Sequence, residues 1–418
     1  MSEQKLELLA PAGDLEKLKI AVTYGADAVY FGGEFFSLRQ GADNLTIPEI
    51  EEGLEFAHEH GCKGYMALNI FAHNEDLEPM RSYLKSLRGI PIDGFLVSDP
   101  GVLDLVKEEL PRAEIHLSTQ ANMTNYQAAA FWRRLGVKRL VLARELSIEE
   151  IREIRRRLPD DVELEAFIHG SMCISYSGRC LLSNFMTGRD SNRGLCAHPC
   201  RYRYVLEEEK RPGMYFPIEE DDRGSYILNS KDLCMIDHIP DLARAGVKSL
   251  KIEGRMKSIF YVATVVHAYR LAIDAYLRDP ENFTLDPALK EELLKVSHRE
   301  FTTGFYYGEP DSEDQNYETS KYIREYSFVG KVLSYDPETH YAVVEQRNKM
   351  LKGDEIEVFG PDIMFFRQTI TSMLDQESGL EIESAPHPQQ IVKIRMEQPV
   401  KPDYILRKKV DEQESPSE

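Results

Sequence analysis

The feature that most constrains the fold is a repeated alternation of short apolar runs with amphipathic segments, which continues through most of the chain. Each apolar run is long enough for one strand, and the segments between the runs carry apolar residues at helical spacing. The expected strands are Leu6–Ala10, Ala28–Phe31, Gly64–Asn69, Gly94–Ser98, Ile115–Thr119, Arg139–Ala143, Glu163–Ile168 and Ser249–Glu253. Eight strand–helix units of roughly 30 residues each predict a (β/α)8, or TIM-type, barrel.

The chain divides into segments of different character. Residues 1–320 hold the strand–helix units, and a Cys-rich insertion at 170–235 follows the seventh strand. Residues 321–407 alternate Val, Tyr and polar residues between turn signals, which predicts a small all-β domain, a β-barrel. The acidic, apolar-poor tail at 408–418 is expected to be disordered. A doubly wound parallel sheet is the alternative to the large barrel, because pattern alone does not fix topology.

Charge and apolar patterning limit the classes of function. The formal net charge of -20 disfavours a broad, non-specific grip on nucleic acid, although a local basic patch is still compatible with it. No apolar run approaches the length needed to cross a membrane, and the N-terminus lacks the pattern of a signal peptide. We therefore expect a cytoplasmic protein, in which clustered cysteines are more often metal ligands than disulfides.

The insertion carries four of the six cysteines of the chain, with the spacing C-x6-C-x15-C-x3-C. These are Cys173, Cys180, Cys196 and Cys200. Structural zinc usually uses two tight pairs, and only the last two cysteines form one, whereas a wider iron–sulfur cluster tolerates irregular spacing. Spacing alone supports zinc and iron–sulfur equally, and unliganded core thiols are a third option. Cys234 could replace Cys200 as the fourth ligand.

The same insertion is rich in arginine. Arg179, Arg189, Arg193, Arg201 and Arg203 lie between and after the cysteines, and Asp190 is the one acid among them. Guanidinium groups match carboxylates and phosphates in shape and charge, so this segment could face an anionic substrate. The alternative is that these arginines lie on a solvent-exposed surface without a ligand, as clustered charged residues most often do.

Other candidate site residues follow from the barrel prediction, because working residues project from the C-terminal ends of barrel strands. Those ends supply Asn69, Gln120, His169 and Glu253 as candidate catalytic groups, and Arg255 as a clamp for a carboxylate. His169 could act as a general base, or it could be a structural histidine beneath the insertion. For Arg255 the alternative is a salt bridge at the barrel rim.

Four stretches together resemble the U32, or collagenase-like, peptidase family. They are LLAPAGDLEKLKIAVTYGADAVYFGG, HLSTQANMTN, the insertion with HGSMC, SGRC and CAHPC, and LNSKDLCMIDHIPDLARAGVKSLKIEGRMKS. The resemblance covers nearly the whole chain, including the C-terminal β-module. Within the family, the chain is most similar to the prephenate-dependent transfer-RNA uridine hydroxylases, which install 5-hydroxyuridine at the wobble position.

The resemblance implies an oxygen-sensitive 4Fe-4S cluster held by Cys173, Cys180, Cys196 and Cys200. Some relatives lack a match for Cys200 and use a later cysteine, so Cys234 is the alternative fourth ligand. The resemblance also implies prephenate, a small dicarboxylate, as co-substrate. The implied macromolecular partner is the anticodon region of transfer RNA, and similar proteins that occur as paired paralogues suggest a paralogous subunit as a further partner.

The resemblance also suggests roles for the arginines. Arg255, together with Arg179 or Arg193, would hold the carboxylates of prephenate. Arg189, Arg201 and Arg203 would position the anticodon backbone.

Two rival functions remain open at this point. One is a collagenase-like peptidase with a structural metal, and the other is a non-catalytic partner of a paralogue. A hydrolase would pair His169 with Ser171 or Cys173 as nucleophile. Residues two and four apart on extended chain do not easily come within the roughly 3 Å that such a pair needs, which disfavours the peptidase.

Overall fold

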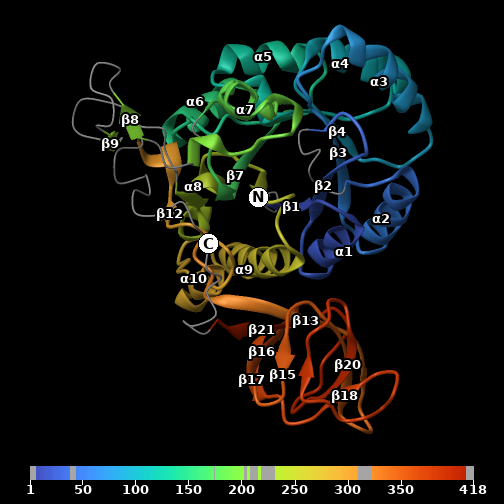
Figure 1. The fold of residues 1–418 in the computed structure, drawn as a ribbon. Coiled ribbons are helices and arrows are strands. Elements are labelled where there is room, and N and C mark those ends of the chain that lie inside the picture. Colours follow the sequence, from blue (N-terminus) through green and yellow to red (C-terminus); the bar gives the residue numbers. More distant parts are fainter. Residues whose placement is uncertain are drawn as a thin grey trace.

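The computed structural model describes residues 6–37, 44–173, 175–201, 205–207, 215–217, 231–308 and 322–410. Its larger part is a closed barrel of eight parallel strands (Figure 1). The strands are β1 (Glu7–Ala12), β2 (Ala28–Gly32), β3 (Lys63–Leu68), β4 (Gly94–Val97), β5 (Ile115–Leu117), β6 (Arg139–Val141), β7 (Glu163–Ser171) and β11 (Ser249–Ile252). Because β11 pairs with both β1 and β7, the sheet closes. The predicted (β/α)8 barrel is confirmed, and the doubly wound alternative is excluded.

Helices surround the barrel. They are α1 (Leu15–Thr23), α2 (Ile47–Glu59), α3 (Asn74–Ser86), α4 (Pro100–Glu109), α5 (Tyr126–Arg134), α6 (Ile148–Arg157), α8 (Ile239–Arg244), α9 (Ile259–Arg278) and α10 (Pro287–Leu294). Side-chain caps fix several starts: Asp14 accepts from the Lys17 amide at 2.8 Å, and Ser147 with Glu150 forms a capping box. No helix in the described part of the chain is long and apolar enough to cross a bilayer.

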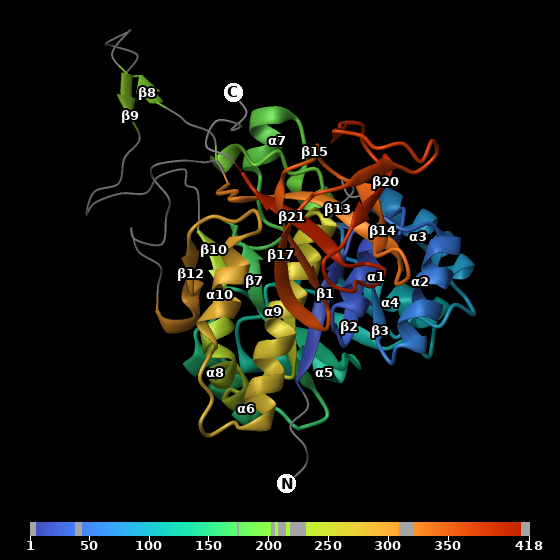
Figure 2. The ribbon, with the colours of Figure 1, turned by 90° about the horizontal axis from the view of Figure 1, so that it is seen from below.

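The Cys-rich insertion leaves and rejoins the barrel at one end. The last residues of β7 pair antiparallel with β10 (Asp232–Cys234), and β10 in turn pairs with β12 (Phe301–Thr302). Within the insertion, the structure describes α7 (Leu182–Thr187) and a separate hairpin of β8 (Val205–Glu207) and β9 (Tyr215–Pro217). Figure 2 shows α7 beyond the ends of the barrel strands. The insertion therefore covers the end of the barrel from which β7 emerges.

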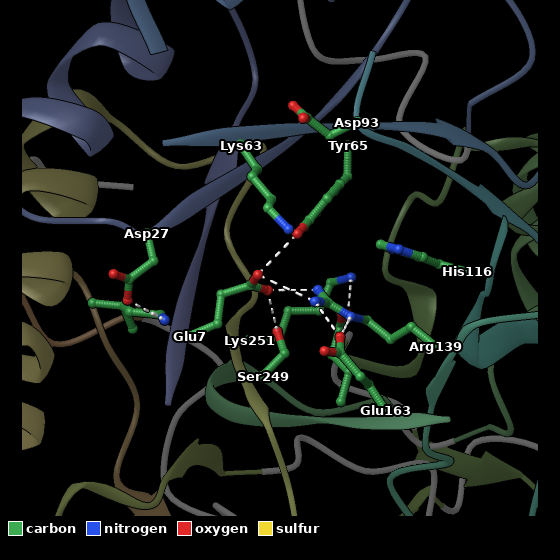
Figure 3. A network of polar contacts seen from close by, with 12 residues as sticks. Glu7, Asp27, Lys63, Tyr65, Asp93, His116, Arg139, Glu163, Ser249 and Lys251 are labelled. Carbon is green, nitrogen blue, oxygen red and sulfur yellow. Dashed lines mark hydrogen bonds and ion pairs between the residues drawn. The ribbon is translucent and has the colours of Figure 1, made fainter. Parts of the chain in front are cut away.

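A layer of charged side chains lies inside the opposite, N-terminal end of the barrel (Figure 3). Arg139, the first residue of β6, is 3% exposed and forms ion pairs with Glu7 at 2.5 Å and Glu163 at 2.6 Å. Glu165 lies 3.4 Å from the same guanidinium group and 2.7 Å from Lys251. This charge layer, defined by these five residues, joins β1, β6, β7 and β11 across the barrel interior.

The C-terminal part is a separate all-β domain that lies beside α9 and α1 (Figure 1). Its seven-stranded sheet has the order β17-β16-β21-β13-β14-β20-β18. These strands are β13 (Tyr326–Asp336), β14 (Tyr341–Gln346), β16 (Glu355–Gly360), β17 (Ile363–Thr369), β18 (Met373–Asp375), β20 (Ile391–Arg395) and β21 (Ile405–Lys409), and a small ladder pairs β15 (Met350–Leu351) with β19 (Ser384–Ala385). Within the described residues no pairing joins β17 to β18, so strand pairing does not close the expected small barrel.

The boundary between this domain and the tail differs from the sequence-based expectation. β21 continues through Lys408 and Lys409, which the prediction assigned to the disordered tail. Lys408 forms an ion pair with Asp354 at 3.0 Å, and both lysines pair with β13, which explains the extra length of the strand. Residues 411–418 lie outside the described part of the chain.

Candidate functional site

A cavity of about 280 Å³ lies at the C-terminal end of the barrel strands, beneath the insertion. Residues of the barrel strands themselves form its floor, among them Ala67, Leu96, Val141, Phe167 and Lys251. Residues that follow the strands form its wall, including Asn69, Gln120, Arg144, Glu253 and Arg255. The insertion contributes the remaining side. The cavity therefore lies at the end of the barrel where (β/α)8 enzymes carry their active sites, and polar groups line it.

All four cysteines of the insertion line this cavity, and none of the four is in a disulfide. Cys234, the alternative fourth ligand, does not line it. Its thiol is buried beside the Tyr269 hydroxyl at 3.8 Å, and burial raises its pKa. The position of Cys234 therefore favours Cys200 over Cys234 as the fourth thiol of a site in this cavity.

Thiols are good ligands for iron and zinc, but the four cysteines are not arranged around a single metal position. Among the described residues, no group of three or more His, Cys, Asp or Glu side chains is placed to hold a metal ion. The surroundings of Cys180 nevertheless favour a thiolate. Burial would raise its pKa, but hydrogen bonds from Ser175, Ser191 and two backbone amides outweigh burial and lower it. A thiol with a lowered pKa is the form that binds iron or zinc.

Positive charge dominates the cavity wall. Five cations line it: Arg144, Arg189, Lys251, Arg255 and Lys257. Glu253 is the one carboxylate among the described lining residues, and it already pairs with Arg144 at 3.1 Å. In a protein with a net charge of -20, this local excess of cations favours an anionic ligand.

Glycine makes room for Arg255 in the wall. Arg255 is 4% exposed, and its backbone and guanidinium group press against the ends of β1 and β2. A Cβ atom at Gly32 would lie 2.6 Å from a guanidinium nitrogen of Arg255, and one at Gly13 would overlap the Arg255 carbonyl. Only glycine at these positions allows so close an approach, so the stretch before α1 and the end of β2 are shaped around Arg255.

The amide side chains that were predicted as catalytic meet in the wall. The Asn69 amide nitrogen donates to Gln120 Oε1 at 2.8 Å and to Ser118 Oγ at 3.0 Å. Asn69 and Gln120 also line a smaller neighbouring cavity of about 150 Å³, together with Phe71 and Arg179. The predicted pair therefore separates two adjoining cavities at the barrel end.

The predicted base His169 does not line either of these cavities. Its ring is 1% exposed, and it packs among Tyr261, Tyr269 and Phe301. Burial, with a smaller effect of Lys257, lowers its pKa to about 3. A buried, neutral imidazole cannot exchange protons with a substrate in the cavity, so its position favours the structural alternative.

The predicted arginines lie in different places. Arg189 lines the main cavity and Arg179 the smaller one, where its guanidinium carbon lies 5.8 Å from the centre of the Phe71 ring. Arg193 instead forms a two-point ion pair with Asp76 on α3, with both distances 2.8 Å. Arg193 thus ties the insertion to the barrel. The side chain of Arg201 and the whole of Arg203 lie outside the described residues.

We expect the substitution Asp76→Asn to loosen the insertion. Arg193 lowers the pKa of Asp76, so this charged contact holds at neutral pH and is lost only as the pH falls through that lowered value. Losing hydrogen bonds to a charged group costs about 1.5–3 kcal/mol, which corresponds to an increase of about tenfold or more in local opening. Trypsin should cut within the insertion correspondingly faster. Asp161→Asn, which removes an exposed pair with Arg133, is the control, and equal cutting in the two variants would contradict this role.

Sequence reasoning missed the charged groups beneath the cavity floor. Lys251 and Glu165 lie within strands that were predicted correctly, but their charges were not considered. The missed signal is a polar residue followed two positions later by a charged one, Glu163 and Glu165 in β7 and Ser249 and Lys251 in β11, since side chains two apart share one face of a strand.

Comparison with known proteins relates most of the chain to one family. The family model "Peptidase family U32" matches residues 13–316, and "Peptidase family U32 C-terminal domain" matches residues 324–407. The chain is 48% identical over 405 residues to tRNA hydroxylation protein P1 of Bacillus subtilis (strain 168), covering 97% of this chain and 95% of that protein.

Two more distant relatives carry different kinds of name. tRNA hydroxylation protein P of Escherichia coli (strain K12) is 38% identical over 398 residues, which cover 85% of this chain and 86% of that protein. A collagenase of Porphyromonas gingivalis (strain ATCC BAA-308 / W83) is 33% identical over 372 residues, which cover 86% of this chain and 88% of that protein.

Proposed function

The chain belongs to peptidase family U32, and from that premise we propose that it is an enzyme that hydroxylates transfer RNA. Two of its relatives, at 48% and 38% identity, are named tRNA hydroxylation proteins. The proposed reaction converts the wobble uridine to 5-hydroxyuridine, with prephenate as co-substrate and a 4Fe-4S cluster as cofactor. The single observation that carries the proposal is the cavity, which is lined by four cysteines, five cations and one carboxylate.

The proposed ligands of the cluster are Cys173, Cys180, Cys196 and Cys200. They come from one insertion, line one cavity and include a thiol whose pKa is lowered by hydrogen bonds. When bound, an iron–sulfur cluster supplies one-electron chemistry. Zinc is the alternative cofactor, and analysis of iron and acid-labile sulfide separates the two.

The proposed co-substrate, prephenate, carries two carboxylates. Arg255 and Lys257 lie on the segment that follows β11, and Arg144 lies after β6, so cations reach the cavity from two sides. Bidentate contact from a guanidinium group is the strongest way for a side chain to hold a carboxylate. In this arrangement Arg255 has the clamping role that was expected for it. Arg193 is occupied by Asp76 and is not part of the proposed site.

The proposed RNA contacts lie at the rim. Arg189 and Arg179 are exposed on the insertion, next to the main and the smaller cavity, where phosphates of a folded RNA can approach. A uridine turned out of its stack could enter beside Asn69 and Gln120, because amide groups can hydrogen-bond the edge of a pyrimidine. In this proposal Glu253 keeps Arg144 in place by their ion pair.

A deletion strain tests the function. If the gene and any paralogous gene are removed, 5-hydroxyuridine in total transfer RNA, measured by nucleoside mass spectrometry, should disappear. The wild-type gene should restore it, and Arg255→Met should restore less than about a tenth, because one charged anchor is commonly worth about tenfold or more. Arg133→Met changes an arginine on the outer face of α5 and is the control, which should restore fully. Full 5-hydroxyuridine in the deletion strain would refute the proposal.

The collagenase among the relatives favours a second candidate, a peptidase. This candidate predicts that the purified, metal-stripped protein cleaves gelatin and is indifferent to Cys196→Ser. A non-catalytic partner would instead show hydroxylation only after co-purification with a second chain. The burial of His169, the base that a hydrolase would have used, favours the hydroxylase.

A further inference from the structure

We propose that Lys251, on β11, is the anchor at the closed end of the cavity for a carboxylate of the small organic acid that binds there. This role rests on the proposed function, because that function supplies the acid. Neither the sequence patterns nor the family resemblance pointed to this residue.

The position of Lys251 is unusual for a lysine. Its side chain is 3% exposed, yet the residue lines the cavity, and its ammonium group lies beside the rings of Tyr30 and Phe167, which line the cavity too. Ser249, two residues earlier on the same face of β11, donates to Glu7 at 2.8 Å in the charge layer. Of the five residues of the charge layer, Lys251 is the one that lines the cavity. Figure 3 labels Lys251 together with Ser249 and Glu7.

The contacts of Lys251 leave donors for a ligand. Its Nζ lies 2.7 Å from Glu165 Oε1, and Glu165 is the one carboxylate paired with it among the described residues. Its other close neighbours are aromatic rings: Tyr30, with the ring centre at 4.3 Å, and Phe167, at 5.5 Å. An ammonium group carries three N–H donors, and ring faces attract the charge without accepting a conventional hydrogen bond.

The electrostatics of this position favour a second anion. Burial lowers the pKa of Lys251, and this effect outweighs the opposing attraction of Glu165. A buried cation is costly unless its charge is met, and a ligand carboxylate in the cavity would add a favourable interaction to the one that Glu165 already makes. Arg144 stacks on the Phe167 ring at 3.9 Å, so a second cation lies close to the same part of the cavity.

The depth of the site favours a small acid over the RNA backbone. A phosphate in a folded RNA would have to pass the rim and reach a nitrogen that the barrel almost entirely encloses. A compact carboxylic acid fits a cavity of about 280 Å³. The rim cation Arg189, which is exposed, is the better partner for a phosphate.

The test is a binding measurement on the full chain, carried out without oxygen. Prephenate is titrated calorimetrically into the wild type, Lys251→Met and Lys295→Met. Lys295 is the matched control, because it is also a shielded lysine between carboxylates, at 2.7 Å from Glu292 and 2.9 Å from Glu357, but it lies away from the cavity. The Kd of Lys251→Met should rise about tenfold or more, and that of Lys295→Met should stay at the wild-type value.

A second measurement uses only the wild type, so it does not depend on the folding of a variant. Acetic anhydride acetylates accessible amines, and peptide mass spectrometry reports the rate at each lysine. Saturating prephenate should slow acetylation of Lys251 about fivefold or more while leaving Lys295 unchanged, because a ligand bound in the cavity blocks the approach of the reagent to Lys251 and adds a second carboxylate to its ammonium group.

The outcomes separate this role from the proposed function. An unchanged Kd in Lys251→Met, or unprotected Lys251 in the wild type, would overturn the role and leave RNA hydroxylation intact. A wild type that binds no prephenate would overturn both the co-substrate and the role. Loss of 5-hydroxyuridine in the deletion strain would still support hydroxylation in that case.

Discussion

Replacing Cys180 by serine should leave the protein unable to keep an iron–sulfur cluster. The thiol lines the cavity with the three other cysteines of the insertion, and hydrogen bonds lower its pKa. Serine fills nearly the same space but stays protonated and binds iron poorly, so one of four cluster bonds is lost. Iron and acid-labile sulfide per chain, measured after anaerobic purification, should fall to a small fraction of the wild-type value, and the brown colour should go with them.

Two other cysteines are the controls for this experiment. Cys62 is buried far from the cavity, where its thiol donates to the Ala26 carbonyl at 3.2 Å, and a serine hydroxyl can make the same bond. Cys62→Ser should keep full iron. Cys234→Ser should also keep it if Cys200 is the fourth ligand, as the positions of the two thiols favour. Zinc in the wild type at one ion per chain, or equal iron in Cys180→Ser, would contradict the cluster as proposed.

Cluster binding should also order the insertion. The described residues contain no ready-made group of metal ligands, although the four thiols share one cavity wall. Bringing four sulfurs onto one cluster therefore requires local rearrangement of the insertion, in which Gly178, Gly188 and Gly194 have positive φ. The cluster-loaded wild type should accordingly resist trypsin better in this segment than Cys180→Ser does.

Replacing Arg139 by methionine should destabilise the barrel by about 3–5 kcal/mol, because the change leaves charged partners buried without their cation. Arg139 pairs with Glu7 and Glu163 and lies 3.4 Å from the fully buried Glu165. The single tryptophan of the chain, Trp132 on α5, reports unfolding of the barrel by its fluorescence in urea, separately from the C-terminal domain. Arg133→Met breaks only an exposed pair with Asp161 and should cost about 0–1 kcal/mol.

The effect of Arg139→Met should depend on pH. Burial raises the pKa of Glu165, but Lys251 and Arg139 together lower it below its ordinary value. A carboxyl with a lowered folded pKa stabilises the fold above its unfolded pKa of about 4.3, and this stabilisation is lost as the pH falls through the folded value. Without Arg139 the pKa of Glu165 should rise. The gap in stability between Arg139→Met and the wild type should therefore narrow as the pH falls from the higher pKa of Glu165 in the variant to the lowered pKa in the wild type, which lies below about 4.3. A gap that stays constant from pH 7 down through this acidic range would contradict this account.

The sequence was sufficient for the large barrel and for the family. The strands were predictable because each is a short apolar run between helices with their own caps, such as Asp14 and the Ser147–Glu150 box. The family resemblance, carried by the same stretches that form β1, β2 and the insertion, is confirmed by the match over residues 13–316. The small domain was predictable as all-β, but its expected closure into a barrel is not made by strand pairing among the described residues, because hairpin signals specify neighbours along the chain and not the pairing of the two edge strands.

The location of the cysteines was predictable from the order of the elements along the chain, because a segment that follows β7 must start at the C-terminal end of the barrel. Only the tertiary structure decided which charged side chains meet. Arg193 and Asp76 are 117 residues apart, and Arg139 and Glu7 are 132 apart. Closure of the barrel sets these distances, and no local pattern encodes them. For the same reason, only the folded chain shows that His169 is enclosed and that Lys251 lines the cavity.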